Sequence, residues 1–214
     1  MNIANPVFRT RALAWLGLVA LSLPLTGGTC TEDRTIQVAA NAEVTVTYPA
    51  RDAIGSFEGS WLVNLATEAD IGEILKDNGF EGRVVAYIEG AFVRVTRRDD
   101  VAAERTVTGT VAVAENGGAE FPLITDQSFV VEDPSEAEWR PVPLEEPGVS
   151  LIHDALEEYL TDIYEGQPEP TEPVLRFHVS GALEPQGVAS DFDWEVRMVV
   201  VLIGEREVTI VDPL

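Results

Sequence analysis

The sequence is poor in the residue types that usually carry catalysis or metal binding. Among its 214 residues are one cysteine and two histidines, His153 and His178. The histidines do not have the four-residue spacing of a helical zinc pair. The sequence also lacks a Gly-x-Ser-x-Gly elbow, a phosphate-binding glycine loop and a dinucleotide fingerprint. These absences disfavour a hydrolase, and we expect a protein without catalytic residues, cofactor or bound metal.

The histidines themselves fit ordinary surface positions. His153 falls on the polar side of an expected helix, near Glu157, and we expect it to be solvated. His178 alternates with the apolar residues Phe177 and Val179, so we expect it to face outward from a strand. Neither histidine is a candidate site residue.

Two acidic pairs are the weak candidates for cation binding. Asp191 and Asp193 flank a phenylalanine, and Asp99 and Asp100 are adjacent near the end of an expected strand. Clustered carboxylates bind hard cations such as calcium, but these pairs lack the spacing of a calcium loop. A carboxylate pair can also hydrolyse glycosides, yet so acidic a chain always offers some pair. We therefore interpret both pairs as solvated strand-end charges.

Positive charge is scarce. The formal net charge is −23, and removal of residues 1–29 would take away Arg9 and Arg11 but no acidic residue, which makes it −25. Between Glu115 and Glu172 there are sixteen acidic residues and a single basic one, Arg140. Such a surface repels nucleic acid. It either keeps the protein soluble or captures cations or a basic protein partner.

A run long enough to cross a bilayer is also missing. The run from Ala12 to Leu25 follows two arginines and has 14 residues, whereas a spanning helix needs about 20. This layout predicts a signal peptide over residues 1–29. The longest apolar stretch downstream, Met198 to Ile203, is typical of a buried strand. We therefore expect an exported chain.

The only cysteine, Cys30, follows this run directly, in the sequence LTGGTC. The arrangement resembles the lipobox of bacterial lipoproteins, although the leucine, Leu25, stands two places further upstream than usual. The resemblance implies that a diacylglycerol is attached to Cys30 and that the chain is anchored to a membrane of the cell envelope, in the periplasm or at the surface. The alternative is ordinary cleavage, for example after Gly28, which yields a secreted soluble protein with a free thiol.

Residues 30–214 are enough for a single domain with a sizeable core. Period-two alternation dominates them, as in Thr35 to Tyr48, where a bend near Ala39 to Ala42 is expected to divide a long strand. The further strand candidates are 60–65, 83–96 with a break near Gly90, 106–114, 129–132, 174–183, 192–203 and 207–211. Turns are expected at 116–118, at 184–187 and at Gly204-Glu205. The pattern predicts a mainly β protein, an antiparallel β-sandwich or alternatively a barrel.

Two helices interrupt the strands. A short one has Thr67 and Asp70 at capping-box spacing and a stop at Asn78-Gly79. A longer amphipathic helix begins at Ser150 as N-cap, with apolar residues at helical spacing. They are Ile152, Ala155, Leu156, Tyr159, Leu160 and Ile163. The Pro/Glu-rich segment 119–173 that contains it is interpreted as an acidic insertion, docked on the β body through this helix.

Trp139 and its neighbour Arg140 are the candidate contact residues. Trp61 and Trp194 share the apolar parity of their strands, so we expect both in the core. Trp139 lies instead in the Pro/Glu-rich loop SEAEWRPVP. It is either packed against the domain or exposed for a partner.

These observations favour a non-enzymatic binding or structural protein of the cell envelope, anchored through Cys30. The alternatives are a β-barrel carrier of an apolar ligand, which needs an internal cavity, and a carboxylate-dependent hydrolase. The sequence itself does not name a ligand or a partner.

Overall fold

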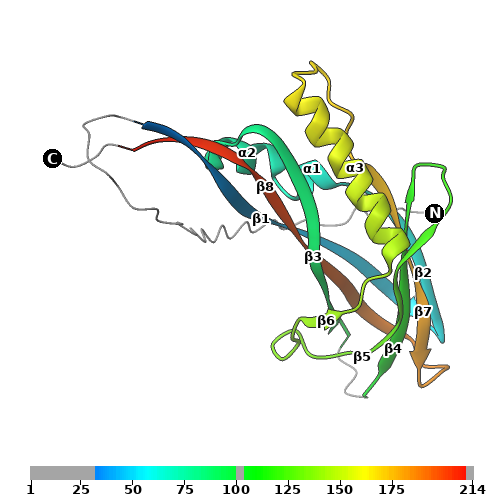
Figure 1. The fold of residues 1–214 in the computed structure, drawn as a ribbon. Helices are drawn as coiled ribbons and strands as arrows, with labels where there is room; N and C mark the ends of the chain where they lie inside the picture. Colours follow the sequence, from blue (N-terminus) through cyan, green and yellow to red (C-terminus); the bar gives the residue numbers. More distant parts are fainter. Residues whose placement is uncertain (1–31, 100–103, 211–214) are drawn as a thin grey trace.

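The computed structural model describes residues 32–99 and 104–210 and shows a β-sandwich, as predicted (Figure 1). One antiparallel sheet has the strand order β1-β8-β3-β6 and the other has the order β2-β7-β4-β5. The strands of the first sheet are β1 (Glu32–Ala53), β8 (Ser190–Ile210), β3 (Glu81–Arg97) and β6 (Arg140–Val142). Those of the second are β2 (Ser56–Asn64), β7 (Val174–Glu184), β4 (Thr106–Glu115) and β5 (Phe121–Val130). Because the two sheets are separate in this part of the chain, the barrel alternative is wrong.

The first sheet is built around the long pair β1 and β8. Their pairing runs from Glu32 opposite Ile210 to Ala50 opposite Phe192 without a register shift. The expected bend at residues 39–42 is therefore wrong, and so is the turn at Gly204-Glu205. Gly204 is required for packing rather than for a turn, because a Cβ there would lie 2.6 Å from the Phe80 ring.

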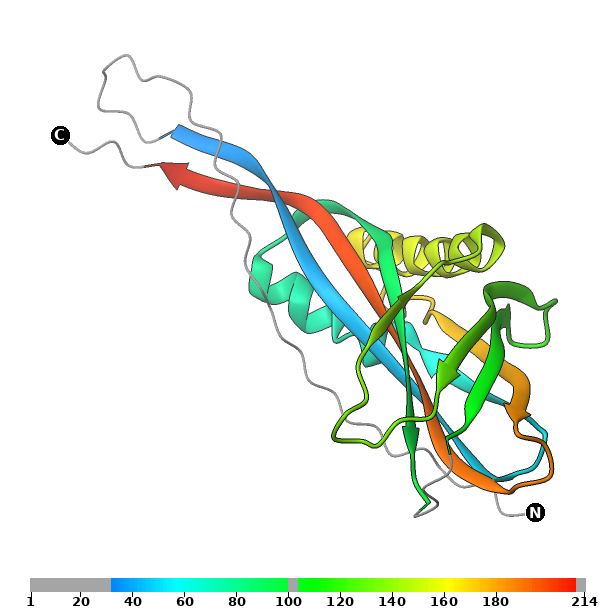
Figure 2. The same cartoon turned by 90° about the horizontal axis from the view of Figure 1, so that it is seen from below.

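Beyond the last pairing with β3, at Glu205, the two strands continue as a two-stranded ribbon that projects from the sandwich (Figure 2). We call this ribbon, residues 32–36 paired with residues 206–210, the arm. Figure 1 shows the arm at the upper left, away from β6 and from the second sheet. Since the same two strands run on into the first sheet, where β1 is the edge strand and β8 pairs with both β1 and β3, the arm is a direct continuation of the sandwich.

The remaining strand predictions are mostly confirmed. β2, β3, β4 and β7 lie where alternation predicted them, and β3 has its expected irregularity between Ile88 and Gly90. Most of β5 and all of β6 escaped prediction, because β5 contains Pro122 and a positive φ at Asp126 and β6 has only three residues. The turn at 184–187 joins β7 to β8, which lie in different sheets, so it is a crossover rather than a hairpin.

The short helical region consists of two pieces, α1 (Leu65–Glu68) and α2 (Ile71–Asn78). Asn64 caps α1 by accepting hydrogen bonds from the backbone N–H groups of Ala66 and Thr67, at 3.1 and 3.3 Å. The predicted capping role of Thr67 is therefore wrong, since Thr67 donates to the cap. The predicted stop is confirmed, because Gly79 ends α2 with a φ of 61°.

The amphipathic helix α3 (Glu146–Tyr164) has Glu145 as its N-cap, five residues before the predicted N-cap Ser150. Pro147 lies in its first turn, where a missing N–H costs nothing, so the proline belongs to the helix rather than to the connector. The predicted apolar face is confirmed: Ile152, Leu156 and Leu160 are buried against the sheets. Gly148 allows this close approach, since a Cβ there would lie 2.6 Å from the carbonyl oxygen of Pro122.

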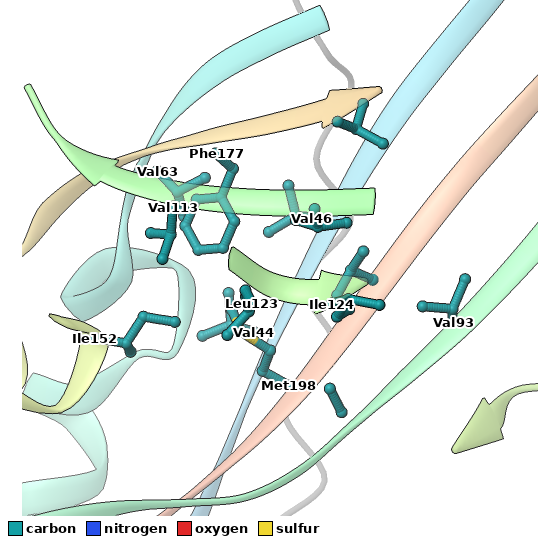
Figure 3. Packing of buried hydrophobic residues seen from close by; sticks show 14 of the residues in the cluster. Val44, Val46, Val63, Val93, Val113, Leu123, Ile124, Ile152, Phe177 and Met198 are labelled. Atoms are coloured by element: carbon teal, nitrogen blue, oxygen red, sulfur yellow. The ribbon is translucent and has the colours of Figure 1, made fainter. Parts of the chain in front are cut away.

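Side chains from both sheets and from α3 fill the space between the layers (Figure 3). Trp194 is fully buried, with its ring centroid 5.3 Å from that of Phe129 and 5.9 Å from that of Phe57. Trp61 is partly buried and stacks on Tyr48 and Phe177. The expectation of two core tryptophans thus holds fully for Trp194 and in part for Trp61. Of the helices in the described ranges, none combines the length and apolarity needed to span a membrane.

Candidate binding surface around Trp139

The candidate surface lies on the outer face of the first sheet, where β3 and β8 pair. Val93 of β3 and Val196 of β8 are paired and point into the core. Because side chains alternate along a strand, the residues on either side of each valine lie on the outer face. The register places Arg94 opposite Glu195 and Phe92 opposite Arg197. These four residues, together with Trp139, form what we call the Trp139 surface.

Trp139 reaches this surface from the connection between β5 and β6. The Cζ atoms of Arg94 and Arg197 lie 4.5 and 4.7 Å from its ring centroid, so the indole packs on two guanidinium groups. Each such cation–π contact contributes about 0.5 to 2 kcal/mol, depending on how far it is desolvated. Trp139 is consequently only partly exposed and packs against the domain.

The two arginines beneath Trp139 differ in how they are paired. Arg94 donates two hydrogen bonds to Glu195, of 2.7 Å from Nε and 3.0 Å from Nη2, a bidentate pair in which both side chains are largely buried. Within residues 32–99 and 104–210, the carboxylate nearest to Arg197 is that of Glu43, at 4.0 Å, and the Arg197 guanidinium also lies 5.0 Å from the centroid of the Phe92 ring. Its Nε atom is buried without a hydrogen-bond partner in the described chain.

The loop before Trp139 is held by a local hydrogen-bonded turn. Asp133 accepts hydrogen bonds from the backbone N–H and the hydroxyl of Ser135, at 3.0 and 2.7 Å. These bonds lower the pKa of the Asp133 carboxyl, and the ion pair with Arg97 at 3.3 Å adds to the effect. The loop that carries Trp139 is therefore tied to β3.

Arg140, the other predicted contact residue, follows Trp139 as the first residue of β6. It lies opposite Val93, its side chain is about half exposed, and its guanidinium pairs with Glu132. The structure thus places Arg140 beside the Trp139 surface but does not bring its guanidinium onto the indole. Cys30, the predicted lipidation site, lies outside the described residues.

The described members of the two acidic pairs, Asp99, Asp191 and Asp193, are compensated by neighbouring donors. Asp193 is buried and accepts hydrogen bonds from Arg51 at 3.0 Å and from Arg98 at 2.6 Å. The carboxylate of Asp191 accepts a backbone hydrogen bond of 2.8 Å. The carboxylate of Asp99 accepts a hydrogen bond of 2.9 Å from Arg105. The interpretation as solvated charges is therefore wrong for Asp99, Asp191 and Asp193, because their carboxylates are bonded by arginines and backbone N–H groups. Asp100 lies outside the described residues.

Both histidines are also more engaged than predicted. His153 is partly buried, with Nδ1 2.9 Å from the carbonyl oxygen of Ala86 and its ring stacked on Tyr87. It is not the solvated residue that was expected. His178 faces outward as predicted and lies between two carboxylates, 3.4 Å from Glu58 and 3.2 Å from Glu120. Residues 32–99 and 104–210 contain no group of three or more His, Cys, Asp or Glu residues arranged to hold a metal ion.

The outer side of α3 carries part of the acidic charge. Asp154 and Glu158 are exposed there, whereas Glu157 pairs with Arg83 of β3 and lies 3.7 Å from His153. Asp154 and Glu158 thus have no ion pair within the described residues, whereas Glu157 does. A role in binding cations or a basic partner stays a prediction.

Comparisons with known proteins find distant structural likeness only. No family model and no curated protein matches the chain. A structure of turnip yellow mosaic virus is 12% identical, with a TM-score of 0.29 over 80% of this chain and 96% of that chain. Desmodium yellow mottle tymovirus is 10% identical, with a TM-score of 0.32 over 91% and 97%. Tobacco necrosis virus is 11% identical, with a TM-score of 0.32 over 86% and 90%. With values this low, the fold assignment rests on the strand pairing itself.

Proposed function

We propose that this chain is an exported, non-enzymatic binding module of the cell envelope, anchored to a membrane by a lipid on Cys30. In this proposal the arm connects the anchor to the sandwich, and the Trp139 surface is the contact surface. The lipid on Cys30 would place the arm next to the bilayer. The Trp139 surface would then face away from the membrane, toward a ligand or partner.

The observation that carries the proposal is the unbroken pairing of β1 with β8 from Glu32 to Ala50. Cys30 precedes Glu32 by two residues, which is at most about 7 Å of chain. Thr45, opposite Arg197, follows Glu32 by thirteen residues, or about 43 Å at about 3.3 Å per strand residue. An anchored chain would therefore hold the Trp139 surface about 40 Å or more along the strand from its lipid.

The non-enzymatic part of the proposal follows from how the polar groups are used. Asp99 and Asp193 belong to the two acidic pairs that the sequence offers, and both carboxylates are in ion pairs with arginines. A general acid or base must exchange a proton with substrate, and a carboxylate held in an ion pair is poorly suited to that task. The binding role follows from Trp139, since aromatic and arginine side chains are enriched in binding surfaces.

Metabolic labelling tests the anchor. A bacterial host grown with radioactive palmitate should label the wild-type chain, whereas the Cys30→Ser variant should carry no label and should leave the membrane fraction. Detergent, rather than high salt, should release the wild-type chain, because two or more acyl chains give stable anchoring. Equal labelling of wild type and variant would refute lipidation at Cys30.

A further inference from the structure

Arg197 stands out among the arginines at the end of the sandwich that contains the Trp139 surface. Each of the other six has a carboxylate oxygen no farther than 3.3 Å away in the described chain. They are Arg51, Arg94, Arg97, Arg98, Arg105 and Arg140. The nearest carboxylate to Arg197, that of Glu43, lies 4.0 Å away, beyond hydrogen-bond distance. This guanidinium thus has donors that the surrounding residues do not use.

The guanidinium of Arg197 is also held in place. It lies over the rings of Phe92 and Trp139, at 5.0 and 4.7 Å from their centroids, which restricts the plane of the group. Its Nε atom is buried, whereas 26% of the side chain as a whole is exposed. A planar, fixed fork of N–H donors matches the two oxygens of a carboxylate.

The charge of the chain limits the size of the ligand. With a formal net charge of −23, the protein repels a large polyanion before contact. A small molecule with one negative charge is repelled far less, and salt screens that repulsion within about 8 Å. The neighbouring Glu43 competes for the same donors and weakens the site further.

We propose that Arg197, beside Trp139, is a binding site for a small ligand with a single carboxylate group. The proposal deepens the binding role proposed above and rests on it only for the choice of surface, since Cys30 takes no part in the site. The carboxylate accepts hydrogen bonds from the Nη atoms of Arg197, and the remainder of the ligand lies against the Trp139 indole. A sugar acid and an amino-acid carboxylate both have this chemistry.

The site can be tested by nuclear magnetic resonance on the full chain in detergent micelles, using the indole N–H signal of Trp139 as the reporter. The signal is assigned by its loss in Trp139→Phe. The probes are glucuronate against glucose and N-acetylglycinate against N-acetylglycinamide, all at constant ionic strength. We expect a saturable shift in the millimolar range with at least one carboxylate and no saturable shift with its neutral partner. The two pairs of probes distinguish a sugar acid from an amino-acid ligand.

Matched variants assign the effect to the guanidinium. Arg197→Gln should weaken binding at least tenfold, and Glu43→Gln should tighten it several-fold by removing the internal competitor. Arg83→Gln, at an exposed arginine paired with Glu157 elsewhere on the sheet, should leave the affinity unchanged. The absence of a saturable shift with either carboxylate would overturn the proposal. So would equal shifts with the neutral probes, or an unchanged affinity in Arg197→Gln. If the wild-type chain were not labelled with palmitate, the anchor would be refuted, but the result of this binding experiment would not change.

Discussion

The docking of α3 on the sandwich gives a prediction whose magnitude follows from the structure. Leu156 is 1% exposed and lies on the helix face that packs against the sheets, whereas Glu158, two residues later, is exposed. Replacing a buried leucine by alanine costs about 2 to 5 kcal/mol, because the removed methyl groups lose their burial and leave a cavity. For a domain of this size, a loss of about 3 kcal/mol lowers Tm by roughly 6 to 12 °C.

Urea unfolding of Leu156→Ala and Glu158→Gln measures the difference. The first variant should lose about 2 to 5 kcal/mol with an unchanged m-value. The second should change stability by less than about 0.5 kcal/mol. It also relieves repulsion with Asp154, which lies four residues earlier on the same helix. If Leu156→Ala unfolds at the same urea concentration as Glu158→Gln, the helix is not docked in solution and the reasoning fails.

Two further predictions concern close packing and pH. Gly148→Ala should destabilise the fold by about 1 to 3 kcal/mol in urea titrations, because the added Cβ would lie 2.6 Å from the carbonyl oxygen of Pro122. The better helix propensity of alanine does not offset this clash. A gain in stability would contradict the packing. Asp133 has a lowered pKa in the folded chain, so its contribution to stability is present above the unfolded value of about 3.9 and disappears as the pH falls through the folded value. Asp133→Asn should therefore unfold more easily than wild type at pH 7, and this difference should shrink as the pH falls through the lowered folded pKa of Asp133. A difference independent of pH would contradict the assignment.

Regular alternation made most of the fold predictable. Strands β4 and β7 alternate cleanly, so their limits were predicted within one residue. The length of β1 was underestimated, because the run of small residues near Ala40 suggested a bend. In the folded chain those residues lie in uninterrupted pairing with β8. Local sequence cannot reveal that a partner strand of similar length will supply this support.

The site was predictable only in part. The unusual context of Trp139 identified the loop, but the residues beneath it, Arg94 and Arg197, come from strands that are distant in sequence. Their outward parity within the predicted strands was the available signal. That parity does not tell which of the many outward charges meet one another, because the answer depends on strand order and register. For the same reason, the ion pairs that neutralise Asp193 were missed.

The most direct test of the account is the orientation of the anchored chain on a membrane. Lipidation of Cys30 would leave an introduced cysteine as the only thiol for a dye. We choose two exposed positions for it: Glu205→Cys at the base of the arm and Glu136→Cys in the loop before Trp139. Energy transfer from each dye to acceptor lipids in vesicles reports its distance from the bilayer. We expect transfer several-fold stronger from position 205 than from position 136. Equal transfer from vesicle-bound protein would mean that the sandwich lies flat on the membrane, which would contradict the account.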